Sequence, residues 1–248
     1  MRFWRRFCAA DAAVAAYLFC AICLTANSAR ADDEARILLF SGRDLWWNGA
    51  FAFGGFLIAP RSLDEDGFIL KAMLSSGLYR YNAQSLGGEQ VVGAEGIVQL
   101  SPGWRTKIGT AEFKFFMGPE FQIHRLWPDD PSNRLRGHFL GLRMSAELWY
   151  EPTSATMIAA DLSLSSIATS NSGRLAFGFR VLDEMLGGVY AGPETQFFGS
   201  DGYRHLRFGA HVTSMKTEDM EWSAGLGWAT DSSGRSSPYL RLGLIQRR

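Results

Sequence analysis

The side chains of this sequence that could do chemistry are mainly charged ones, and they recur at alternate positions opposite apolar residues. They are Lys71, Glu95, Glu112, Lys114, Glu120, Arg143, Glu147, Asp161, Arg174, Arg180, Glu194, Arg207 and Arg241. Seven of them are basic and six are acidic. A solute-selective pore usually carries charge of one dominant sign, whereas a balanced set in a confined space pairs with itself. We therefore expect a structural polar network, with a ligand-binding or pore-lining set as the alternative.

Two catalytic arrangements could be built from these carboxylates and the four histidines. Glu120 and Glu147 could form the carboxylate pair of a glycoside hydrolase, but Arg143 is placed to neutralise them. A histidine could activate a serine nucleophile, although no local motif accompanies any of the four. His205 and His211 lie six residues apart, about 20 Å along a strand, which is too far for a shared metal ion. We therefore expect no catalytic residues, no metal site and no cofactor.

The element that positions these side chains is clearest in the stretch from His138 to Pro152. Large apolar residues from Leu140 to Tyr150 occupy every second position, and Gly141, Arg143, Ser145 and Glu147 fill the others. This alternation predicts a β-strand with one apolar face. A run of about ten such residues is long enough to cross a bilayer when the strand is tilted. The pair Trp149-Tyr150 at its end predicts an aromatic girdle at the membrane surface.

The same pattern recurs along the chain and predicts about twelve strands. Their ranges are 35–47, 50–59, 68–81, 89–100, 111–125, 138–152, 155–166, 174–182, 187–198, 203–215, 221–230 and 236–248. Short turns join them, so the predicted fold is all-β, an antiparallel up-and-down transmembrane β-barrel. Ten strands result if 35–59 forms no hairpin. Pro102-Gly103 predicts a turn, and Pro119 predicts a bulge or an edge.

Inside such a barrel, alternate residues face the lumen. The candidate luminal polar network comprises Glu95, Glu112, Glu120, Arg143, Glu147, Arg180, Glu194 and Arg207. Inward Trp149 and Tyr190 could serve as aromatic platforms for a sugar, whereas Tyr150 belongs to the girdle. With both termini periplasmic, the loops near 48, 82–88, 126–137, 167–172, 199–202 and 231–235 are expected outside.

The first residues predict a route to the outer membrane. Arg2, Arg5 and Arg6 precede an apolar stretch, and Ala29-Arg30-Ala31 is an A-x-A cleavage site. Residues 1–31 are therefore expected to be a secretory signal peptide, and 32–248 the barrel domain in the outer membrane of a Gram-negative bacterium. All three cysteines lie within the predicted signal. The remainder has a net charge near −3, which gives no indication of a nucleic-acid partner.

Six stretches together resemble a known family. They are LFSG at 39–42, DEDGFILKA at 64–72, DDPSNRLRG at 129–137, AELWYEP at 146–152, YAGPETQFFGSDGYRHLRFGAH at 190–211 and GWATDSSGRSSPY at 227–239. In this order and spacing they are similar to the bacterial cellulose biosynthesis protein of the BcsS type, over nearly the whole predicted barrel. The resemblance implies an outer-membrane β-barrel that accompanies cellulose synthase systems, with no established catalytic residues to carry over.

The resemblance implies a non-enzymatic accessory to bacterial cellulose biosynthesis, acting in export or in surface anchoring of the polymer, and so in exopolysaccharide and biofilm formation. The partners expected on this basis are outer-membrane lipid and either cellulose or other components of a cellulose-synthase system. Two alternatives remain open. One is a small outer-membrane porin, and the other is a barrel-embedded hydrolase acting on envelope lipid or polysaccharide.

Overall fold

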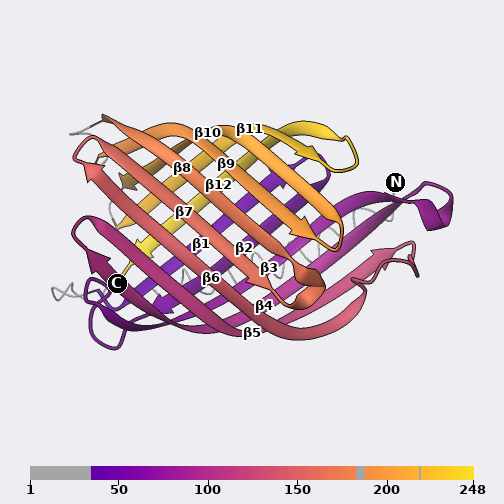
Figure 1. Cartoon of the computed structure of the whole chain (residues 1–248), viewed down its shortest axis with the longest axis horizontal. Coiled ribbons are helices and arrows are strands. Elements are labelled where there is room, and N and C mark those ends of the chain that lie inside the picture. The colour runs from indigo at the N-terminus through magenta and orange to yellow at the C-terminus, as the bar shows by residue number, and fades with distance from the viewer. Residues whose placement is uncertain (1–34, 183–187, 218) are drawn as a thin grey trace. The chain divides into compact units, whose positions relative to one another are not determined.

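The computed structural model describes residues 35–182, 188–217 and 219–248. They form a closed barrel of twelve antiparallel strands in which each strand pairs with its neighbours in sequence and β1 pairs with β12 (Figure 1). The predicted signal peptide, its cleavage site and the three cysteines lie outside the described residues.

The strands are of unequal length. They are β1 Ile37–Trp46, β2 Gly49–Ile58, β3 Gly67–Ala83, β4 Glu89–Ile108, β5 Ala111–Trp127, β6 Gly137–Thr153, β7 Thr156–Ser165, β8 Asn171–Leu182, β9 Val189–Ser200, β10 Tyr203–Thr217, β11 Met220–Asp231 and β12 Ser236–Arg247. Two short 3₁₀ turns, η1 (Gln84–Leu86) and η2 (Ile167–Thr169), lie between strands. The prediction of twelve strands is confirmed, and the alternative of ten is wrong because β1 and β2 form a hairpin around Asn48.

Closure depends on the first and last strands. β1 pairs with β12 from Leu38↔Arg247 to Trp46↔Tyr239, and the backbone amides of Arg36 and Ile37 both donate to the Arg248 carbonyl at 2.8 Å. Lipid offers no hydrogen-bond partners to a strand edge, so a sheet crosses a membrane only when it is closed. Among the described residues, no helix has the length and apolar character needed to cross a bilayer.

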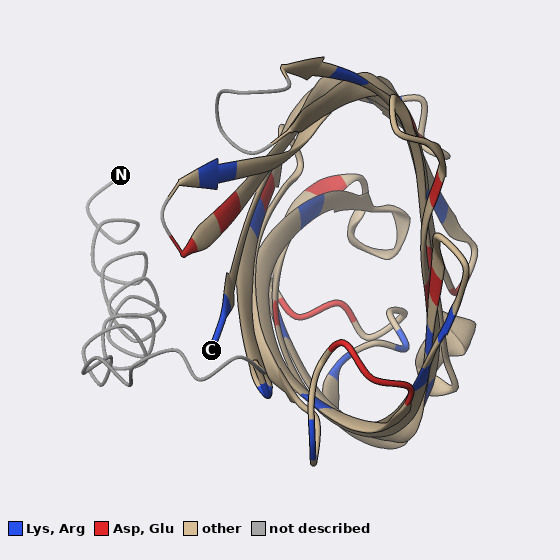
Figure 2. Ribbon diagram, turned by 90° about the vertical axis from the view of Figure 1, so that its left-hand side faces the viewer, with Lys and Arg blue, Asp and Glu red and all other residues tan. Residues whose placement is uncertain are grey.

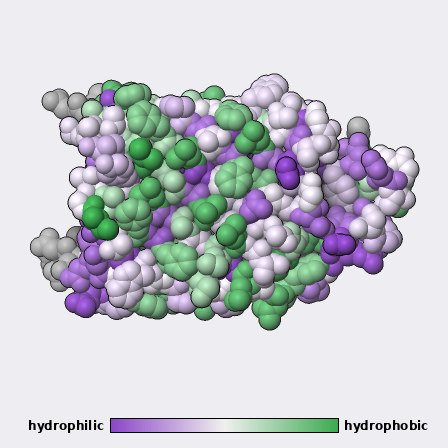
Figure 3. Space-filling model, viewed as in Figure 1, coloured by the Kyte–Doolittle hydropathy of each residue, from purple (hydrophilic) through white to green (hydrophobic). Residues whose placement is uncertain are grey.

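The predicted alternation is clear on β6. On β6, Leu140, Leu142 and Met144 are exposed on the outer face, and Arg143 between them is partly buried on the inner face. On the face shown in Figure 3, many apolar side chains lie over the middle of the barrel, and hydrophilic ones gather toward the end of the long β3–β4 and β5–β6 hairpins. The outer surface therefore matches a membrane-embedded band with a wet rim.

Two predictions about prolines are wrong. β4 continues through Pro102-Gly103 instead of turning, and β5 passes Pro119 without a bulge. The register is the same at Gln99↔Glu120 and at Gly103↔Phe116, on either side of these residues. A Cβ on Gly103 would lie 2.4 Å from the Phe115 carbonyl oxygen and from the Phe116 ring, so this glycine makes room for a packed aromatic ring instead of a turn.

The connections divide between two ends of the barrel. The loops at 47–48, 84–88, 128–136, 166–170, 201–202 and 232–235 share one end, which we call the loop end. The first described residues (35–36), the C-terminus and the turns at 59–66, 109–110 and 154–155 share the other, the terminal end. The grouping of the six loops follows the prediction, and their exposure to the outside stays a prediction.

At the terminal end, the β2–β3 connection turns into the barrel. Leu63 is buried against Leu57, Ile69 and Phe116, and its backbone amide donates to the Ala35 carbonyl at 2.8 Å. This apolar cluster narrows the lumen at that mouth. End on, the strands form a closed ring with charges of both signs around its wall (Figure 2).

The outer face gives a direct test of membrane depth. Leu226 is 64% exposed and lies between Ala210 and Leu240, in the middle of the apolar band. Leu226→Arg should lower the free energy of unfolding from lipid vesicles by about 2–4 kcal/mol, because an arginine there faces hydrocarbon. Thr230→Arg, near the loop-end rim, should cost only about 0–1 kcal/mol. Denaturant titration followed by tryptophan fluorescence measures both, and equal costs would contradict this placement of the band.

Candidate functional site

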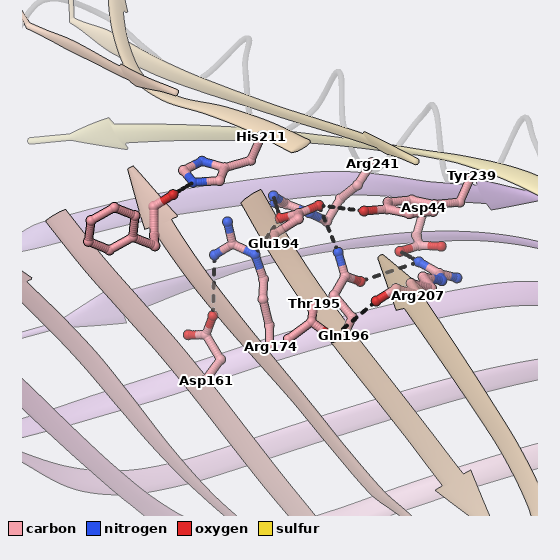
Figure 4. Close-up of polar contacts among 11 residues, drawn as sticks. Asp44, Asp161, Arg174, Glu194, Thr195, Gln196, Arg207, His211, Tyr239 and Arg241 are labelled. Atoms are coloured by element: carbon pink, nitrogen blue, oxygen red, sulfur yellow. Dashed lines mark hydrogen bonds and ion pairs between the residues drawn. The ribbon is translucent and has the colours of Figure 1, made fainter. Parts of the chain in front are cut away.

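The inward charges form several connected groups, and one of them surrounds Glu194 on β9 (Figure 4). Its side chain is 0% exposed. Arg174 Nε and Arg241 Nη2 each donate to Glu194 Oε2 at 2.9 Å. The Tyr239 hydroxyl and Gln196 Nε2 each donate to Oε1 at 3.0 Å. Four donors satisfy the acceptor capacity of a carboxylate, so Glu194 can stay ionised without water.

Arg207 on β10 extends this group toward β1. Its Nη1 contacts Asp44 Oδ2 at 2.5 Å, and its guanidinium lies over the rings of Phe198 and Tyr239, at 4.8 and 5.1 Å. Beside it, His205 stacks on Trp46 at 4.1 Å between ring centroids. β10 and β1 are three strands apart around the barrel, so these contacts cut across part of the lumen.

A second group surrounds Glu120 on β5, which is also 0% exposed. Arg143 Nε donates to Glu120 Oε2, and Ser165 Oγ and Gln122 Nε2 donate to Oε1 at 2.5 and 2.6 Å. Gln122 Oε1 also lies 2.8 Å from His124 Nε2. These contacts join three adjacent strands, β5, β6 and β7.

A third group links β3 to β6. Lys71 Nζ donates to Glu147 Oε1 at 2.5 Å, across two intervening strands, and lies 4.9 Å from the centroid of the Phe116 ring. Further toward the terminal end, Glu112 pairs with Arg105 at 2.8 Å and with Lys114 at 2.6 Å. Ion pairs therefore line the lumen both along β3–β6 and along β8–β12 with β1.

The predicted network residues all face the lumen but do not form one site. Glu120 and Arg143 meet, and Glu147 joins Lys71 instead. Glu95 lies 4.0 Å from His124. Glu112, Glu194 and Arg207 each belong to the groups described above, and Arg180 Nη2 donates to the Tyr190 hydroxyl at 2.6 Å.

The three aromatic candidates lie on two faces. Trp149 and Tyr190 meet edge to face inside the barrel, 6.2 Å between centroids, and the Tyr190 hydroxyl donates to Glu151 at 3.2 Å. Tyr150 faces outward and is partly exposed near the terminal end of β6. Tyr190 is almost fully buried, so a sugar platform here would need a rearrangement.

Sequence reasoning missed three members of the network. Asp44 lies in a strand that begins with a continuous apolar run, although counting every second residue from Leu38 places it on the inner face. Arg105 follows Pro102-Gly103, where the sequence predicts a turn and β4 in fact continues. Tyr239 is visible in the sequence as an aromatic residue, but its bond to Glu194 depends on the pairing of distant strands.

Among the described residues, the contacts of Glu120 and His124 do not assemble either of the two catalytic arrangements. The cross-strand partner of Glu120 is Gly141, six residues from Glu147 on β6, so the two carboxylates lie about 20 Å apart, beyond glycosidase range. Ser165 donates to Glu120, and His124 reaches that carboxylate only through Gln122. A serine nucleophile needs its histidine in direct contact.

A separate polar cluster organises the β5–β6 loop at the loop end. Asp130 accepts bonds from the hydroxyls of Ser85 and Ser132, both at 2.7 Å, from the Tyr81 hydroxyl at 2.9 Å and from the Ser132 amide at 3.1 Å. The bonds from Ser85 and Ser132 are the main reason that the pKa of Asp130 is lowered to about 2. The ionised carboxylate thus ties this loop to the β3–β4 connection.

The Glu194 group predicts a large difference between two acidic residues. Glu194→Gln leaves Arg174 and Arg241 without their shared buried carboxylate, and should lower the free energy of unfolding by about 3 kcal/mol. Asp161, whose side chain is 52% exposed, lies 3.6 Å from Arg174. Asp161→Asn should cost less than about 1 kcal/mol. Urea titration of the refolded barrel measures both, and similar losses would show that the Glu194 contacts are not structural.

The Asp130 cluster predicts a pH dependence of the loop. Since the folded pKa lies below the ordinary value, the cluster stabilises the loop above about pH 4 and loses that contribution as the pH falls toward 2. Hydrogen exchange at the Ser132 amide, corrected for the intrinsic rate, should accelerate over this interval. Asp130→Asn should exchange rapidly at every pH, and unchanged protection in that variant would exclude the carboxylate as the organising group.

Comparisons with known proteins agree with the fold. Residues 38–248 match the family model described as cellulose biosynthesis protein BcsS. Among curated proteins, none matches the sequence.

Two solved structures show the same architecture. An outer-membrane channel from Pseudomonas putida F1 has a TM-score of 0.54 and 9% identity, covering 88% of this chain and 97% of that one. The translocator domain of the autotransporter NalP from Neisseria meningitidis has a TM-score of 0.51 and 12% identity, covering 97% of both chains.

At such low identities the structural likeness shows a shared outer-membrane barrel fold and nothing more. The family match is different in kind, because it rests on the sequence and extends over nearly all of the barrel. The chain belongs to the cellulose biosynthesis protein BcsS family.

Proposed function

We propose that this protein is a non-enzymatic accessory of bacterial cellulose production in the outer membrane, which holds or guides the production machinery or its polymer without serving as the conduit. The family supports the link to cellulose, and the barrel supports the outer membrane. Its partner on this proposal is cellulose or another component of the cellulose-synthase system.

The observation that carries the choice between accessory and conduit is the pairing of luminal charges. Glu120 and Glu194 are fully buried by their own partners, and Lys71–Glu147 and Arg207–Asp44 each span three strand positions. A glucan chain would need a continuous wet passage lined with free polar groups. Separating Glu120 or Glu194 from its arginine would leave a buried charge uncompensated, at a cost of about 3–5 kcal/mol for each.

A narrow passive channel is the second candidate. Asp161 faces the lumen and is half exposed, and Glu147 is partly exposed beside it, so water reaches this part of the lumen. Small solutes could pass through such a space even if a polymer could not.

The experiment measures extracellular cellulose by dye binding and glucose analysis in a strain lacking this chain. Deletion should reduce cellulose, and the wild-type chain should restore it. A Lys71→Met/Glu147→Leu double variant, which keeps the lumen filled but removes a charge pair, should restore it equally. Membrane levels of each variant are the control. Cellulose that is unchanged on deletion would contradict the proposal, and failure of the double variant at normal levels would favour a working lumen.

Single-channel conductance distinguishes the proposed accessory role from that of a passive channel. Wild-type protein in planar bilayers should give small or no single-channel currents, because the lumen is bridged from both sides. Large and stable currents would favour the channel. Asp161→Arg should change the ion selectivity of any small current, since Asp161 is a half-exposed charge on the luminal face.

A further inference from the structure

The arginines of the barrel differ in their surroundings according to the face they occupy. The inward arginines Arg105, Arg143, Arg174, Arg207 and Arg241 all have a carboxylate partner. Arg125 on β5 faces outward, on the same face as Phe121 and Ile123, and is exposed. Within the described part of the chain it has no carboxylate partner. An outward arginine at the edge of an apolar band therefore lacks the counter-charge that the inward ones have.

The outer faces of the strands around Arg125 carry a second arginine and a histidine. Arg80 lies two strands away on the outer face of β3, and its guanidinium donates to the Trp47 carbonyl. His138 on β6 lies outward beside Phe121, 6.0 Å between ring centroids. No acidic side chain lies on the outer face of β3–β6 among the residues described. This patch is suited to an anionic group at the membrane surface.

A hollow of about 470 Å³ lies at the base of the β5–β6 loop, and its lining includes Arg125, Trp127, Arg136 and Asp129. Asp129 is paired with Arg136 at 3.0 Å, so it does not cancel the charge of Arg125.

The outer face of β4 beside Arg125 carries small residues. Ala94 is paired with Arg125, and Gly96 is paired with Ile123. A Cβ added to Gly96 would meet nothing within 4 Å. These small residues leave room for an acyl chain between Arg125 and the apolar band at Val98.

We propose that this surface binds a phosphorylated glycolipid of the outer leaflet, with its phosphate on Arg125, its sugar in the hollow beside Trp127 and an acyl chain along Ala94 and Gly96. A guanidinium suits this task because it stays charged and can donate two parallel hydrogen bonds to a phosphate. A second copy of this chain is a poorer occupant, since it would bring a like-charged patch against the first. The loop end then faces outward, because it contacts the leaflet that holds this lipid.

The test uses full-length barrel purified in detergent and probed by native mass spectrometry with diphosphoryl lipid A. The wild-type chain should retain one molecule, and Arg125→Gln should weaken retention about tenfold. Gly96→Leu should also weaken retention, because the leucine fills the space proposed for the acyl chain. The fold should stay intact, because a Cβ on Gly96 meets nothing within 4 Å. Arg61→Gln, which removes an exposed arginine from the terminal end, is the matched control and should bind like the wild type.

Three further probes identify the source of the phosphate. Dephosphorylated lipid A and phosphatidylglycerol should both bind at least about tenfold more weakly, and millimolar inorganic phosphate should not displace lipid A. Equal binding by phosphatidylglycerol would overturn the glycolipid assignment, and displacement by free phosphate would overturn the lipid site. Undiminished binding by Arg125→Gln, or equal weakening by Arg61→Gln, would overturn the role of Arg125. Heat-modifiable gel mobility confirms that each variant is folded.

Discussion

The hydrogen-bonded pairing of β1 with β12 is the constraint on which the rest of this structure depends. A twelve-stranded sheet in lipid cannot leave an edge, and closing the sheet creates an inside and an outside that alternate along every strand. The outside must be apolar to remain in lipid. The inside is too narrow to leave every polar group in bulk water, so its charges either pair or remain costly.

The charged lumen follows from that limited space. Glu194 illustrates the solution, because two arginines, a tyrosine and a glutamine from β8, β9 and β12 satisfy one carboxylate. Glu120, four strands away on β5, repeats the solution with Arg143, Gln122 and Ser165. The balance of charge signs that is visible in the sequence therefore corresponds to local neutralisation in the structure. An accessory role agrees with such an interior better than polymer passage does.

Much of the fold could be predicted because period-two alternation is a local property. The strand around Arg143, the hairpin at Asn48 and the inward face of each charged residue required only counting along the chain. Prolines misled the prediction at Pro102 and Pro119, since the strands tolerate lost amide donors when the neighbouring register holds. The partners of individual charges could not be predicted. Whether Glu147 meets Arg143 or Lys71 depends on the stagger between strands, which no local pattern records.

The contacts that join strands three positions apart have a mechanical consequence. Lys71–Glu147 acts as a chord on one side of the ring, and Arg207–Asp44 acts as a chord on the other. A barrel held only by its ladder can flatten into an oval, because hydrogen bonds along the wall resist bending weakly. Ion pairs that hold two strands at a fixed distance across the lumen oppose that flattening. The cross-section of this barrel should therefore hold its shape when lateral pressure in the membrane changes.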